Sequence, residues 1–126
     1  MKRIFISILM LFVAVAMASA ADYNIKKYGA VSDTTKYSTK ALQKAIDACS
    51  KAGGGRVVVP AGNYKIGSIL LKSNIHLHLE LGATLYGSTH IEDYTPYATD
   101  FKSLRTQGTT VQLIYGDKVE NVVIDG

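Results

Sequence analysis

Three side chains near the middle of the sequence are of types that can bind a metal ion. His76, His78 and Glu80 occupy alternate positions, so they would share one face of an extended strand. Zinc takes histidine and carboxylate ligands at about 2 Å. Three ligands on one strand would span about 13 Å, which is too far for a single ion. We therefore expect a solvated strand face, and the alternative is two of these residues with a distant third ligand.

The other reactive side chains favour structural roles. Glu92 and Asp93 are adjacent, but a general acid and a general base must face each other across a sugar, so we expect a solvated loop here. Cys49 lies on the apolar side of a predicted helix, without a histidine at a recognisable spacing. It is predicted to be a buried apolar residue, not a nucleophile. Three further polar residues are assigned to loops or turns: Asp33, His90 and Asp125.

Residues 90–105 form the least strand-like part of the sequence after the first helix. Tyr94, Tyr97 and Phe101 could stack on sugar rings, but the favoured interpretation is that they pack the loop against the protein. Lys102 and Arg105 are interpreted as ordinary surface charges.

A helix is predicted over residues 38–52. Its apolar residues form one stripe at helical spacing: Ala41, Leu42, Ala45, Ile46 and Cys49. Ser38 or Thr39 can cap its start, and the glycines at 53–55 can end it.

Short strands separated by turn residues are predicted after the helix. They cover residues 57–59, 64–66, 68–71, 75–80, 83–86, 111–115 and 119–124. Segment 73–77 resembles segment 120–124, an offset of 47 residues. With roughly 20 to 25 residues in each coil of a parallel β-helix, this offset predicts two coils. Alternation from Ile75 to Leu81 places the odd-numbered residues in the core.

The first twenty residues predict a cleavable signal peptide. Lys2 and Arg3 precede an apolar run, and Ala18-Ser19-Ala20 has the form that signal peptidase requires. Cleavage after Ala20 would leave 21–126 as one domain, secreted or periplasmic. That part has 12 basic and 10 acidic residues, which does not indicate a nucleic-acid partner. A single cysteine cannot form an internal disulfide.

Several sequence blocks resemble the pectin lyase-like β-helix superfamily. These are YGA at 28–30, ALQKAIDAC at 41–49 and GGGRVVVPAGNY at 53–64. LELGATLYGS at 79–88, Asp93-Tyr94 and VENVVIDG at 119–126 are similar to glycoside hydrolase family 28, the polygalacturonases. The resemblance implies an all-β fold, a right-handed parallel β-helix with an N-terminal capping α-helix. Because no polar cap follows the last strand, we expect the first few coils of an incomplete fragment.

The resemblance also implies an inverting, metal-free hydrolysis of pectic galacturonan by aspartates. The family's Asn-Thr-Asp, Asp-Asp, Gly-His-Gly and Arg-x-Lys motifs do not occur in this sequence. We therefore assign no catalytic, cofactor-binding or metal-binding residue. The expected partner of the intact protein is galacturonan, with no nucleic acid, no membrane after signal cleavage and a monomeric state.

Two alternatives remain open. One is another β-helix polysaccharide enzyme, a lyase or an epimerase-like protein that shares the same N-terminal blocks. A lyase would use calcium and a basic residue, so motifs outside this chain would decide. The other is a non-catalytic β-helix segment that binds carbohydrate.

Overall fold

The computed structural model describes residues 22–97 and 111–126. The predicted signal peptide at 1–20 and the residues Phe101, Lys102 and Arg105 lie outside these ranges. The described strands are β1 (Asp22–Asn24), β2 (Gly55–Val59), β3 (Gly62–Ile66), β4 (Ile69–Leu70), β5 (Ile75–Leu79), β6 (Ala83–Gly87), β7 (Ile114–Tyr115) and β8 (Val123–Asp125). The helices are η1 (Ile25–Tyr28), α2 (Thr39–Lys51) and η2 (Ile91–Asp93).

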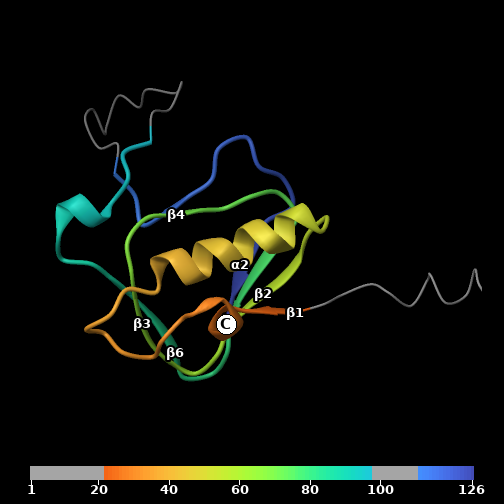
Figure 1. Ribbon diagram of the computed structural model, residues 1–126. Helices are drawn as coiled ribbons and strands as arrows, with labels where there is room; N and C mark the ends of the chain where they lie inside the picture. Colours follow the sequence, from red (N-terminus) through yellow and green to blue (C-terminus); the bar gives the residue numbers. More distant parts are fainter. Residues whose placement is uncertain (1–21, 98–110) are drawn as a thin grey trace, which may run out of the picture.

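The strands form three parallel sheets (Figure 1). Their orders are β1-β2-β5-β8, β3-β6 and β4-β7. Because β2, β3 and β4 belong to three different sheets and β5 returns to the sheet of β2, the chain winds in coils that stack on one another. Every named pair of strands is parallel, which is possible only when a long connection separates the partners. The predicted stacked-coil architecture is therefore confirmed.

The length of the second coil differs from the prediction. Gly55 pairs with Ile75, 20 residues further along, whereas His76 pairs with Val123, 47 residues further along. The echo at an offset of 47 thus marks two directly neighbouring strands, and its interpretation as two coils was wrong. The coil is long because the connection from β6 to β7 is long. The similarity of segments 73–77 and 120–124 shows that they pair with each other, but it does not show how many coils lie between them.

The core lies between the sheets and α2, which packs against β1, β2, β4 and β5 (Figure 1). All five residues of the predicted helical stripe are buried, and Ile25, Val57, Tyr64 and Ile75 join the same cluster. Burying each large apolar side chain contributes about 1.5–3 kcal/mol, so this face is what holds the helix in place. The predicted helix was one residue too long at each end.

Two local predictions fail for identifiable reasons. Leu81, expected in the core, is 99% exposed because β5 ends at Leu79 and the chain turns there. Ser38 takes the N-cap position, but its hydroxyl makes no capping bond, because it bonds both the backbone N–H and the carbonyl of Val31. Strand β1 and helix η1 were not predicted.

No helix within residues 22–97 and 111–126 is long and apolar enough to cross a membrane.

Candidate functional site

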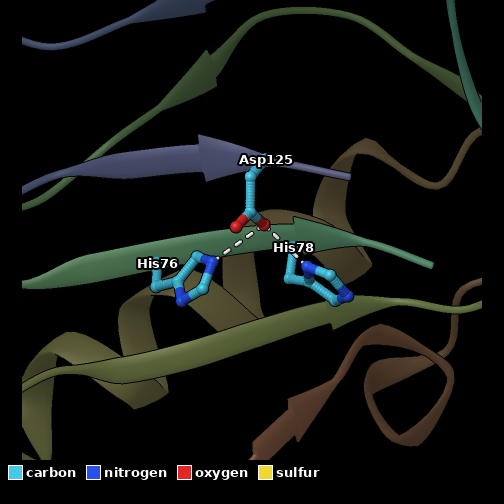
Figure 2. Close-up of side chains that lie close together, drawn as sticks. All are labelled: His76, His78 and Asp125. Carbon is cyan, nitrogen blue, oxygen red and sulfur yellow. Dashed lines mark hydrogen bonds and ion pairs between the residues drawn. The ribbon is translucent and has the colours of Figure 1, made fainter.

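Two histidines and one aspartate meet on the outer face of the β1-β2-β5-β8 sheet. Asp125 of β8 points toward His76 and His78 of the neighbouring strand β5 (Figure 2). One of its carboxylate oxygens, Oδ1, accepts hydrogen bonds from His76 Nε2 at 2.8 Å and His78 Nδ1 at 2.6 Å. The two imidazole rings lie edge to face, with their centres 5.8 Å apart. The structure thus brings together three side chains that can each donate an electron pair.

The strand pattern explains why these side chains meet. Ile75 and Leu77 are buried, so the alternation of a strand sends His76 and His78 to the opposite face. The parallel register places Asp125 beside His78 and Val123 beside His76. Glu80, the third residue of the predicted metal-binding set, follows the end of β5 and does not belong to the cluster. Its place is taken by Asp125, which is a strand residue and not the predicted turn residue.

The cluster is accessible to solvent. The side chains of His76, His78 and Asp125 are 36%, 29% and 49% exposed. Hydrogen bonds from His78, and then from His76, hold the pKa of the Asp125 carboxyl below its usual range. This carboxylate is therefore ionised at neutral pH and ready to accept hydrogen bonds or to bind a cation.

An ion pair and a shallow groove lie beside the cluster. On β2, Arg56 is the register partner of His76, and its guanidinium contacts both carboxylate oxygens of Asp22 at 3.0 and 2.6 Å. The pair keeps the pKa of Asp22 low. The groove is bordered by residues 53–56 and 74–76 together with Asn121 and Val123. Because the guanidinium of Arg56 is paired with Asp22, the hydrogen bonds of Asp125 are made with His76 and His78.

Asp93, assigned to a solvated loop, is instead an anchor for the loop after β6. It ends helix η2, and its carboxylate accepts hydrogen bonds from the hydroxyls of Ser88 and Tyr37. The bond from Ser88, and then that from Tyr37, lowers the pKa of Asp93. Its neighbour Glu92 is exposed and lies 3.7 Å from the ring of His90. The two carboxylates therefore serve different contacts and do not face each other as an acid–base pair.

The predicted packing roles of Cys49 and of the loop tyrosines are confirmed where the structure describes them. Cys49 is completely buried, and burial raises the pKa of its thiol. Tyr94 donates a hydrogen bond to the carbonyl of Ser88 at 2.6 Å. Tyr97 stacks on the buried Tyr115, with 4.4 Å between ring centres. The two tyrosines thus hold the loop in place, whereas Cys49 packs in the core beneath α2.

Asp125 is the residue that sequence reasoning missed at this site. The signal was present, because adding the offset of 47 to His78 leads to Asp125. The offset had been interpreted as two coils, which would have separated the two residues by a whole coil. Direct stacking of the echoing segments is what makes the contact.

Stacked parallel strands returning to the same sheet after each coil define a parallel β-helix protein. Residues 23–125 match the family described as "Rhamnogalacturonase A/epimerase, pectate lyase-like", and the chain belongs to this family. The resemblance to family 28 polygalacturonases is also confirmed. The chain is 33% identical to a family 28 exopolygalacturonase of Yersinia enterocolitica, with a TM-score of 0.71 over 85% of this chain and 20% of that one.

Two curated relatives represent different activities. An exo-poly-alpha-D-galacturonosidase of Dickeya chrysanthemi is 52% identical over 71 residues, which are 56% of this chain and 12% of the relative. A mannuronan C5-epimerase of Azotobacter vinelandii is 35% identical over 108 residues, 79% of this chain and 10% of the relative. The chain thus spans about a tenth of the length of either relative.

Proposed function

We propose that this chain is the N-terminal part of an exported glycoside hydrolase that cleaves α-galacturonosidic bonds in pectin. The observation that carries the proposal is the 52% identity to an exo-poly-alpha-D-galacturonosidase. The likeness to a family 28 exopolygalacturonase extends over 85% of the chain and supports the same assignment. Both relatives are much longer than this chain, so the chain would be one segment of a larger enzyme.

In this proposal the described residues form the scaffold of the enzyme. Helix α2 would cap the end of a longer right-handed β-helix, since its apolar face already covers the core beside β1 and β2. The chemistry would be an inverting hydrolysis, in which one aspartic acid protonates the leaving oxygen and other carboxylates activate water. The family's aspartate motifs are missing from this sequence, so the catalytic carboxylates would come from other coils.

The proposal includes export, a pectic polysaccharide partner and no membrane attachment after the signal is cleaved. Lys2 and Arg3, the apolar run behind them and Ala18-Ser19-Ala20 support a signal peptide cleaved after Ala20. Residues 21–126 would then belong to one β-helix domain, secreted or periplasmic. Its partner would be galacturonan and not a nucleic acid, and the protein would act as a monomer.

A uronate epimerase is the second candidate. The match to a mannuronan C5-epimerase covers 79% of the chain, a larger share than the match to the galacturonosidase. Galacturonan and mannuronan are both polymers of uronic acids. The two candidates therefore share a class of substrate and differ in the bond that is changed.

The natural full-length protein, purified from its source, separates these candidates when given polygalacturonate and mannuronan. A hydrolase releases reducing ends from polygalacturonate without forming an unsaturated uronate. A lyase forms the unsaturated product, which absorbs ultraviolet light, and an epimerase changes the NMR signals of mannuronan without shortening it. Reducing-end release without unsaturation is the expected result. Epimerisation without chain cleavage would overturn the hydrolase proposal and support the second candidate.

A further inference from the structure

We propose that His76, His78 and Asp125 form a binding site for a divalent transition-metal ion of the zinc type. The three side chains offer two imidazole nitrogens and one carboxylate oxygen. Imidazole ligands suit zinc, copper and nickel, whereas calcium and magnesium prefer oxygen ligands alone. Within residues 22–97 and 111–126, this is the one group of three or more potential ligands that lie close enough together to hold a metal ion.

The ligand atoms lie close enough together to reach one ion after rotations of the side chains. The three ligand atoms lie within 4.8 Å of one another, and Asp125 Oδ1 is 2.8 and 2.6 Å from the two ring nitrogens. Around a tetrahedral ion with ligand bonds of about 2 Å, neighbouring ligand atoms are about 3.3 Å apart. The carboxylate therefore has to move outward by about 0.5–0.7 Å, and the two ring nitrogens, which lie up to 4.8 Å apart, have to approach each other by up to about 1.5 Å. All three side chains are partly exposed, so solvent leaves room for this movement.

The backbone holds the ligands where the ion needs them. His76 and His78 project from the same face of β5, and β8 is paired with β5 directly alongside (Figure 2). The arrangement supplies the third ligand that one strand alone could not provide. It also leaves one tetrahedral position for water, as in sites with three protein ligands.

Charge at the site favours a cation. Asp125 supplies a carboxylate to the site, and Arg56, the positive side chain on the adjoining strand, is paired with Asp22 at 2.6 Å. When the ion binds, each neutral imidazole would turn its unprotonated nitrogen to the metal and keep its proton on the other ring nitrogen, so the hydrogen bonds to Asp125 would be replaced by metal–ligand bonds. Because its ligands come from two coils, it would tie β8 to β5 and stabilise the folded chain. This inference depends on the geometry of the cluster and not on the proposed hydrolase activity.

Titration calorimetry on the purified chain without a polyhistidine tag tests the site. Zinc chloride is the probe, and calcium and magnesium chloride are the comparison ions. We expect one zinc ion per chain, no heat from calcium or magnesium, and a rise in the melting temperature with zinc. His76→Ala, His78→Ala and Asp125→Asn should each weaken zinc binding at least tenfold, because even the loss of a residue that only orients a metal ligand costs about 10–100-fold in affinity.

His90→Ala is the matched control, because His90 is an exposed histidine outside the cluster. It should bind zinc like the unchanged chain. Circular dichroism of every variant checks folding, and the nearly isosteric Asp125→Asn keeps the test valid if a histidine variant does not fold. Absence of zinc binding, or zinc binding that none of the three substitutions weakens, would overturn the proposal. Replacing zinc by cobalt gives an absorption spectrum that should report nitrogen and oxygen ligands in the unchanged chain and change in His78→Ala.

Discussion

The side chain of Asn121 donates a hydrogen bond to the side chain of Asn74, one coil below, at 3.1 Å. Both residues have the left-handed backbone conformation, with φ of 55° and 63°. Their coils are also joined by a backbone hydrogen bond from the N–H of Asn74 to the carbonyl of Glu120. Asparagine tolerates this conformation better than other residues with a side chain, which explains why it recurs at the same corner of two coils.

Replacing Asn74 should separate the backbone effect from the hydrogen bond. Asn74→Ala loses both and should lower the free energy of unfolding by about 1–2 kcal/mol. Asn74→Gly loses the hydrogen bond but keeps an easy left-handed conformation, so its loss should be smaller. Urea denaturation monitored by circular dichroism measures the free energy of unfolding of the two variants. Equal losses would show that the side-chain bond, and not the backbone conformation, is what matters at this corner.

Gly54 and Gly53 provide a matched pair for testing how closely the coils approach. Both have positive φ, 106° and 101°, so an alanine is strained at either position. A Cβ on Gly54 would lie 2.5 Å from both the Cβ and the carbonyl oxygen of Asn74, whereas one on Gly53 has nothing within 4 Å. Overpacking should cost Gly54→Ala about 1–3 kcal/mol of folding free energy beyond the cost of Gly53→Ala. Gly54→Ala should therefore have the clearly lower melting temperature. Similar melting temperatures for the two variants would contradict this close approach.

Gln43 of α2 substitutes for a neighbouring strand at Leu70 of β4. Its side-chain amide accepts a hydrogen bond from the backbone N–H of Leu70 at 2.9 Å and donates one to the carbonyl at 3.0 Å. Gln43→Ala leaves both groups without this partner and should destabilise the chain by about 1–3 kcal/mol. Lys44→Ala, an exposed position on the same helix, is the control and should change little. The urea midpoints of the two variants are compared, and an equal midpoint would argue against the bridge.

Acid should weaken the fold partly through Asp93. Hydrogen bonds from Ser88 and Tyr37 lower its pKa in the folded chain, so its contribution to stability is complete above the unfolded pKa of about 4. This contribution to stability is lost as the pH falls through the lower pKa that Asp93 has in the folded chain. Asp93→Asn should therefore melt below the unchanged chain at neutral pH, and the difference should shrink below about pH 4. Melting curves across this range test the sign, with the exposed neighbour Glu92→Gln as control. A difference that grows in acid would refute it.

Most of the fold could be predicted from local patterns. The stripe from Ala41 to Cys49 defined α2 to within one residue at each end, and Gly, Pro and Asn marked the corners between short strands. Strand β1 was missed because its three residues carry no periodic pattern, and it is held by pairing with β2 across more than thirty residues. Pairing at that separation depends on the assembled coils and not on the sequence around β1.

The candidate site was half predictable. The alternation around Ile75 and Leu77 placed His76 and His78 on the outer face, as the structure shows. The position of Asp125 depended on the register between β5 and β8, which a local pattern does not contain. An assumed coil length of roughly 20 to 25 residues placed β5 and β8 two coils apart, whereas a single coil of 47 residues joins them.

The uneven coil length bears on how this scaffold could be engineered. Partners in β3 and β6 are 21 residues apart, and partners in β4 and β7 are 45 apart, so the additional residues enter between β6 and β7. The strands on either side, β6 and β7, still pair in register with β3 and β4 of the coil below. The pairing of strands in neighbouring coils is thus independent of the number of residues that connect them. A foreign binding loop could be grafted between β6 and β7 without shifting the layers above it.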